Sequence, residues 1–106
     1  MGVPRNPHYA ASKGALMAMT RSIAVEYGGQ GIRANMILPG RMTTALGARN
    51  QEDPAVTARR AAGVPMGRIG APSECAGLVV YLLSDAASYH TGSVIPLDGG
   101  LSVALR

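Results

Sequence analysis

Tyr9 and Lys13 are the residues of this chain whose types and spacing could do chemistry together. They stand four positions apart, and in a helix that spacing puts two side chains on one face. A free phenol has a pKa of about 10, too high for efficient proton transfer at neutral pH, and a nearby ammonium group lowers it. A tyrosine tuned in this way can exchange a proton with a carbonyl/alcohol pair. The spacing alone is equally compatible with a solvated Tyr–Lys pair on a helix surface.

The helix that must carry the pair is predicted to run from Asn6-Pro7 to Tyr27. Asn can cap free amides, and Pro is tolerated at the first helical position because its missing N–H would be unpaired there. Gly28-Gly29 is expected to end the helix in a left-handed conformation. Apolar residues occupy more than one helical face, which predicts cover by a sheet and by another subunit or segment.

Two strands are predicted. Ile32–Leu38 resembles a buried parallel strand and is ended by Pro39-Gly40. Ser93–Leu97 is the second strand, and Pro96 within it removes a backbone donor, so this strand is expected at a sheet edge. Asp98–Gly100 then closes the strand in a structural role.

The segment between the strands is expected to be largely helical. It contains a loop at Arg41–Asn50, a short helix from Asp53-Pro54 to Gly63, a loop at Pro65–Gly70, a helix from Pro72 to Leu83 and a turn region at Ser84–Thr91. Ala71 is a poor helix cap, so tertiary contacts are expected to hold the start of the second helix. Strands joined through helices predict a parallel α/β sheet. Two strands are too few for a stable sheet, so residues 1–106 are interpreted as a single incomplete domain.

Composition argues against several classes of protein. The formal charge of +4 is scattered and the few aromatic residues are not interleaved with it, which argues against nucleic-acid binding. Cys75 is the only cysteine and is expected to be a small buried hydrophobe, so no internal disulfide forms. Cys75, His8 and His90 form no recognised metal-binding spacing. No membrane-spanning run or signal peptide is evident, so a cytoplasmic location is expected.

Longer stretches of the chain carry a family resemblance. Tyr9–Leu16 (YAASKGAL) resembles the active-site helix of the short-chain dehydrogenase/reductase family. The resemblance continues in order through Gly31–Asn35, Pro39-Gly40, Pro65–Glu74, Thr91-Gly92 and Leu97–Gly100. The chain is therefore identified as similar to the C-terminal portion of classical members, resembling the 3-oxoacyl-carrier-protein reductase-like ones.

The resemblance implies catalytic roles for two residues. Tyr9 would be the general acid/base, and Lys13 would lower the Tyr9 pKa and hydrogen-bond the nicotinamide ribose. Ser12 is not expected to be the catalytic serine, which in the family lies further upstream of the tyrosine than this chain extends. His90 stands where the family usually has an apolar residue, and it is expected to be packed or at the surface rather than catalytic.

The resemblance also implies a cofactor, NAD or NADP. Pro39, Gly40 and the backbone of Met42 would line its nicotinamide end, and Thr44 would reach toward the carboxamide or diphosphate. Without the resemblance, the Pro-Gly pair would be interpreted as a strand-ending turn and Thr44 as a loop cap.

The expected fold is α/β, the C-terminal part of a Rossmann-type doubly wound parallel sheet. No glycine-rich phosphate-binding turn precedes Tyr9, so the nucleotide-binding half is expected to be absent and this chain alone inactive. The expected function is hydride transfer between NAD(P) and a small alcohol/carbonyl substrate, in a homo-oligomer without nucleic-acid or membrane partners. The alternative is a non-catalytic remnant or assembly module, and the coding sequence upstream of Met1 would distinguish the two. Ligands of open α/β sheets bind at the carboxyl ends of strands, so Tyr9 and Lys13 are predicted to face that end of Ile32–Leu38.

Overall fold

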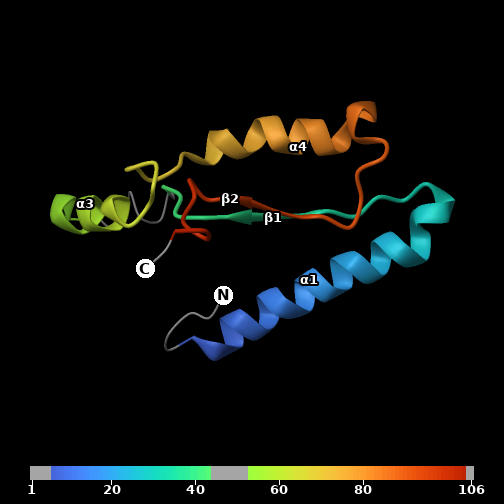
Figure 1. Cartoon of the computed structure of the whole chain (residues 1–106), viewed down its shortest axis with the longest axis horizontal. Coiled ribbons are helices and arrows are strands. Elements are labelled where there is room, and N and C mark those ends of the chain that lie inside the picture. Colours follow the sequence, from blue (N-terminus) through green and yellow to red (C-terminus); the bar gives the residue numbers. More distant parts are fainter. Residues whose placement is uncertain (1–5, 44–52, 105–106) are drawn as a thin grey trace. The chain divides into compact units, whose positions relative to one another are not determined.

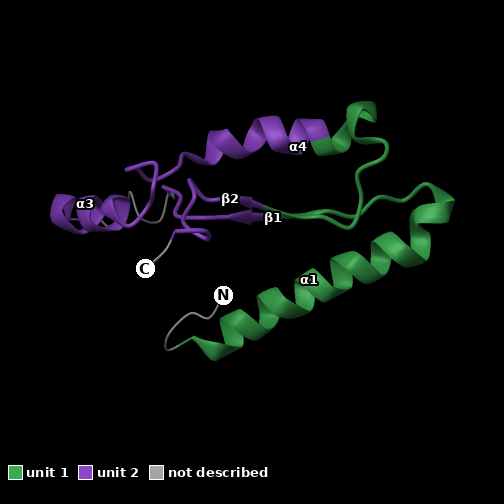
Figure 2. Ribbon diagram, viewed as in Figure 1, with its two compact units in different colours: residues 1–37, 82–95 green, residues 38–81, 96–106 purple. Residues whose placement is uncertain are grey.

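The computed structural model describes residues 6–43 and 53–104 (Figure 1). The helices are α1 (Pro7–Tyr27), α3 (Pro54–Ala62) and α4 (Ala76–Leu83), with short 3-10 turns at Gly28–Gln30, Pro72–Cys75 and Asp85–Ala87; the strands are β1 (Met36–Pro39) and β2 (Val94–Leu97). The chain divides into two compact units, residues 1–37 with 82–95 and residues 38–81 with 96–106 (Figure 2).

β1 and β2 form a two-stranded parallel sheet. The Met36 N–H donates to the Ser93 carbonyl at 2.8 Å, and the Gly40 N–H donates to the Leu97 carbonyl at 2.9 Å. The partners keep the same offset along both strands, which is the pattern of parallel pairing. The predicted α/β class with parallel strands is therefore confirmed.

α1 begins and ends where the sequence predicts, at Pro7 and Tyr27, but the chain leaves the helix in a different conformation. Pro7 occupies the first turn, and the Asn6 side chain makes no capping hydrogen bond. Gly28 stays right-handed at φ −58° and opens a 3-10 turn, so the predicted left-handed stop at Gly28-Gly29 is wrong. Gly31 is the left-handed residue, at φ 80°, and its N–H donates to the Gly28 carbonyl at 3.1 Å. Several nearby glycines can all adopt this conformation, so local sequence does not choose among them.

β1 begins at Met36, later than the predicted strand Ile32–Leu38. The residue before Met36 hydrogen-bonds to the turn that precedes β2 and does not pair with a strand. The Asn35 side chain donates to the His90 carbonyl at 2.8 Å and accepts from the Ser93 N–H at 3.1 Å. These bonds join segments far apart in the sequence and fix where pairing begins.

Arg33 anchors the same turn. Its guanidinium donates to the carbonyls of Leu82 at 2.6 Å and His90 at 3.2 Å. The His90 ring lies 2.9 Å from the Ser93 hydroxyl (Nε2 to Oγ), so this half-buried histidine is packed into the turn. The Gly31–Asn35 motif thus has a structural role in the first unit.

Local sequence signals position α3 correctly. The Asp53 carboxylate accepts from the Ala55 N–H at 2.9 Å, Pro54 occupies the first position, and the helix ends at Ala62 before Gly63. An acidic N-cap followed by Pro marks the start of a helix in the sequence.

The start of the next helix is held by a local bond in addition to the long-range bonds of Gly70, which directly precedes Ala71. The Glu74 carboxylate accepts from the Ala71 N–H at 2.8 Å, as the acidic residue of a capping box does. Ala71 contributes no side-chain bond, and Pro72 follows it in a 3-10 turn. Cys75 in this turn is half-buried rather than fully buried.

Few apolar side chains are buried among the described residues. They are Ala24, Met36, Val64 and Ala87. Large apolar side chains remain exposed on α1 (Leu16, Met19, Val25) and on α4 (Val79, Val80, Leu83). Within the described ranges, no helix is both long and apolar enough to cross a membrane.

Candidate functional site

Tyr9 and Lys13 meet on the first turns of α1. The Lys13 Nζ lies 5.5 Å from the centroid of the Tyr9 ring, within the range of a cation–π contact. This contact confirms that the pair shares a helical face. Tyr9 is 47% exposed. The Ser12 hydroxyl donates to the Tyr9 carbonyl at 2.8 Å and is therefore engaged with the helix backbone.

Gly40 follows β1 and packs tightly against Asp98. A Cβ atom at Gly40 would lie 2.5 Å from the Asp98 Cβ and 2.6 Å from its Cα. Real Cβ atoms do not approach so closely, so only glycine fits here. Hydrogen bonding from Ser102, only partly opposed by burial, holds the pKa of Asp98 below its usual value. The Asp98 carboxylate also accepts from the Gly100 N–H at 3.0 Å, which fixes the turn after β2.

The segment after Gly40 is held by Gly70. The Thr43 N–H donates to the Gly70 carbonyl, and the Gly70 N–H donates to the Arg41 carbonyl, both at 2.9 Å. Met42 and Gly70 thus form a parallel bridge. In such a bridge the two neighbours of Met42 make the bonds, so the N–H and C=O of Met42 itself point away from Gly70.

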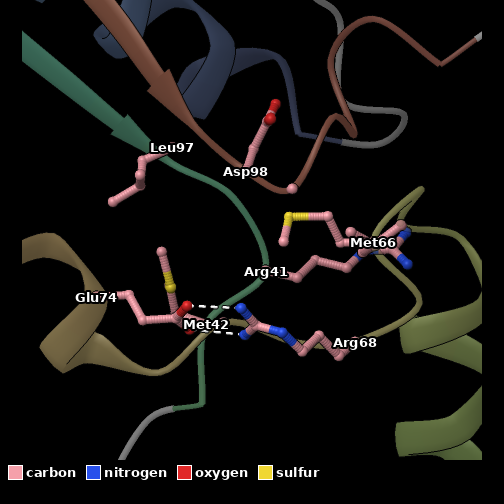
Figure 3. Close-up of a pocket in the computed structure, with 10 residues that line it drawn as sticks. Arg41, Met42, Met66, Arg68, Glu74, Leu97 and Asp98 are labelled. Atoms are coloured by element: carbon pink, nitrogen blue, oxygen red, sulfur yellow. Dashed lines mark hydrogen bonds and ion pairs between the residues drawn. The ribbon is translucent and has the colours of Figure 1, made fainter.

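Arg68 and Glu74 form a two-pronged ion pair beside this bridge (Figure 3). The guanidinium nitrogens of Arg68 lie 2.7 and 2.6 Å from the two carboxylate oxygens of Glu74. The bond from Arg68, followed by the bond from the Ala71 N–H, lowers the pKa of Glu74 to about 2. The sequence interpretation missed this pair, although an acidic residue three positions after Ala71 is a capping-box signal.

A cavity of about 240 Å³ opens beside the ion pair. Figure 3 shows the Arg68–Glu74 pair, Met42 and Asp98 around it; its full lining is Arg41, Met42, Val64, Met66, Arg68, Gly70, Glu74, Leu97, Asp98 and Gly99. Arg41 also donates a hydrogen bond to the Arg60 carbonyl. The cavity therefore mixes apolar and charged walls and lies wholly within the second unit.

The predicted site residues fall in both units. Tyr9 and Lys13 belong to the first, and Pro39, Gly40 and Met42 to the second. Thr44 lies outside the described residues. The predicted orientation of Tyr9 and Lys13 toward the strand end remains a prediction. In the described part of the chain, no group of three or more His, Cys, Asp or Glu side chains could hold a metal ion.

The sequence matches known proteins along nearly its whole length. Residues 1–102 match the family model described as Enoyl-(Acyl carrier protein) reductase. The chain is 41% identical to 2-(S)-hydroxypropyl-CoM dehydrogenase 3 of Xanthobacter autotrophicus, over 96% of this chain and 42% of the relative. It is 42% identical to the inactive 2-(S)-hydroxypropyl-CoM dehydrogenase 2 of the same organism, over 96% of this chain and 46% of the relative. The chain thus spans less than half the length of these relatives.

Solved structures agree with this match. A 4-hydroxyisoleucine dehydrogenase mutant complexed with NADH and succinate is 33% identical, with a TM-score of 0.90 over 100% of this chain and 44% of the other. A gluconate 5-dehydrogenase from Burkholderia cenocepacia in complex with NADP and tartrate is 31% identical, with a TM-score of 0.88 over 99% and 41%. The fold is accordingly part of a Rossmann-type α/β domain. On sequence and structure together, the chain belongs to the short-chain dehydrogenase/reductase family.

Proposed function

We propose that this chain carries the acid/base part of a nicotinamide-dependent oxidoreductase acting on a small alcohol or carbonyl compound. The observation that carries the proposal is the Tyr9–Lys13 contact of 5.5 Å on an accessible helical face, within the family's active-site motif. Tyr9 exchanges the proton at the substrate oxygen, and the Lys13 ammonium lies over its ring. One relative is named inactive, so family membership alone does not decide activity.

The cofactor we propose is NAD or NADP. Solved relatives carry one or the other type of nicotinamide dinucleotide, which when bound supplies or accepts a hydride. In this chain the Met42 N–H and C=O point away from Gly70, an orientation that suits recognition of a carboxamide. Lys13 would hold the ribose hydroxyls, with Pro39 and Gly40 beside the nicotinamide and Thr44 toward the carboxamide or diphosphate.

The test compares the activity and cofactor binding of the chain alone with those of a complete enzyme. Fused behind the N-terminal part of a relative, this sequence is expected to give NAD(P)-dependent turnover on simple alcohols or ketones. The 106-residue chain alone is expected to give neither turnover nor saturable binding of NADH or NADPH at micromolar concentration, followed by cofactor fluorescence. The reason is that a dinucleotide is held mainly by backbone amides of a glycine-rich turn at a helix N-terminus, and residues 1–8 contain no such turn.

Two results would count against these expectations. A fusion that binds the cofactor yet shows no turnover on any alcohol or ketone would favour the non-catalytic alternative. Turnover by the chain alone that disappears in Tyr9→Phe would show that the isolated chain is more capable than proposed.

We also propose that the protein self-associates. Met19 is 53% exposed and Val25 86% exposed on α1, and Leu83 is 81% exposed on α4. Exposed apolar area of this kind marks a binding surface or an aggregation liability. Light scattering of the chain is expected to give a mass above that of the monomer, and a monomer that persists at all concentrations would contradict this. The absence of nucleic-acid and membrane partners, and a cytoplasmic location, stay predictions.

A further inference from the structure

We propose that Glu74 is a positioning residue, which fixes the Arg68–Ala71 loop so that Gly70 orients the Met42 backbone toward the nicotinamide. The inference rests on the proposed function for the role of Met42. The mechanical part of it, that Glu74 controls the bridge at Gly70, stands on the contacts of the second unit alone.

The first step is that Glu74 ties together both ends of a short loop. Its carboxylate binds the Arg68 guanidinium through both oxygens, and one of these oxygens also accepts from the Ala71 N–H. Only Ile69 and Gly70 lie between the two residues that it holds. The Glu74 side chain therefore holds both ends of this loop.

The second step is that the enclosed glycine makes the bridge. Gly70 accepts from the Thr43 N–H and donates to the Arg41 carbonyl, both at 2.9 Å. A Cβ at Gly70 would lie 2.7 Å from the Met42 Sδ, so the end of the Met42 side chain packs against Gly70. Movement of Gly70 would therefore loosen both bonds at once.

The third step is that these two bonds set the direction of the Met42 peptide groups. Because the Arg41 carbonyl and the Thr43 N–H face Gly70, the Met42 N–H and C=O face the other side. Gly40, two residues before Met42, is fixed independently, through its N–H bond to the Leu97 carbonyl. Loss of the Glu74 contacts should thus disturb Met42 and leave Gly40 in place.

Glu74 is placed to act locally. Its side chain is 40% exposed and that of Arg68 is 52% exposed, and ion pairs this open to solvent contribute little to global stability. Two-pronged geometry with a third bond to backbone nevertheless restricts orientation strongly. The expected consequence of removing the carboxylate is local opening without global unfolding.

Amide hydrogen exchange of the full 106-residue chain, resolved to single residues, tests this. In Glu74→Ala the N–H groups of Ala71, Gly70 and Thr43 are expected to exchange about tenfold faster than in the unaltered chain. The Gly40 N–H is expected to keep its rate. Glu26→Ala, which removes an exposed carboxylate from α1, is the matched control and should leave all four rates unchanged.

A second variant, Glu74→Gln, distinguishes a local effect of Glu74→Ala from a general loss of structure. Glu74→Gln keeps an oxygen that can accept from the Ala71 N–H but loses the ion pair with Arg68. It is expected to retain protection at Ala71 and to show an intermediate increase at Gly70 and Thr43. A uniform acceleration that includes Gly40 in both variants would mean a general stabilising role and would overturn the proposal.

A kinetic measurement separates this inference from the proposed function. In an active fusion enzyme, Glu74→Ala is expected to raise the KM for the cofactor several-fold with a smaller change in kcat, and Glu74→Gln to restore part of it. If the fusion never binds a nicotinamide cofactor, the proposed function is wrong. The hydrogen-exchange rates still test whether Glu74 stabilises the Met42–Gly70 bridge. If exchange at Gly70 and Thr43 is unchanged in Glu74→Ala, or both amides are unprotected in the unaltered chain, Glu74 does not position Met42.

Discussion

Replacing Tyr9 with Phe is expected to lower the turnover of a complete enzyme containing this sequence by about 10²–10⁴-fold. The substitution keeps the ring that Lys13 contacts at 5.5 Å and removes only the hydroxyl. Packing in α1 should therefore be preserved while the proposed proton carrier is lost. Steady-state kinetics are expected to show the loss in kcat, with cofactor affinity largely spared.

Three further variants make the Tyr9 result interpretable. Tyr89→Phe removes the same hydroxyl from a fully exposed tyrosine and should leave turnover unchanged. Ser12→Ala should also have a small effect, because the Ser12 hydroxyl bonds only to the Tyr9 carbonyl within α1. Lys13→Met should damage both turnover and cofactor binding, since it removes a charge and the proposed ribose contact. Near-normal turnover in Tyr9→Phe would remove Tyr9 from the proposed mechanism.

Replacing Gly40 with Ala is expected to destabilise the second unit by about 1–3 kcal/mol. The added Cβ would stand 2.5 Å from the Asp98 Cβ and 2.6 Å from the Asp98 Cα. These atoms belong to the chain just after β2 and cannot rotate away as the end of a long side chain could. Relief requires the Gly40 N–H to leave the Leu97 carbonyl, which ends the strand pairing one residue earlier. Urea denaturation measures the effect.

Gly77→Ala is the matched control for Gly40→Ala. Gly77 lies in α4 of the same unit, and a Cβ there would meet nothing within 4 Å. An alanine in a helix interior is favoured over glycine by about 0.5–1 kcal/mol, so this variant should be as stable as the unaltered chain or more so. Equal stability of the two variants would mean that Gly40 and Asp98 do not approach as closely as described.

The parts of this protein that could be predicted from sequence depend on neighbours in the chain. A spacing of four in a helix was enough to bring Tyr9 and Lys13 onto one face. The Asp53-Pro54 pair likewise predicted the start of α3, because its capping bond reaches only to Ala55. The family could be identified for a similar reason, since its motifs are short runs with fixed spacing.

The parts that could not be predicted depend on partners distant in the sequence. β1 begins at Met36 because Asn35 bonds to residues more than fifty positions away, a choice that the alternation of apolar residues does not contain. The left-handed residue after α1 is Gly31 and not Gly28 or Gly29, although each of these glycines could adopt that conformation. For β1, tertiary contacts therefore select the start of the strand, whereas for the turn local sequence does not choose among the glycines.

In the candidate site, too, some features depend on neighbours in the chain and others on partners distant in the sequence. The sequence by itself determined that Tyr9 and Lys13, the proposed acid/base pair, share one helical face, since residue type and helical spacing are local properties. The tertiary structure decided which way the Met42 backbone faces, through two hydrogen bonds to Gly70, and why position 40 must be glycine, through its contact with Asp98. A peptide group has the same composition in every orientation, so only the folded chain, by pairing its neighbours, determines the direction of its N–H and C=O.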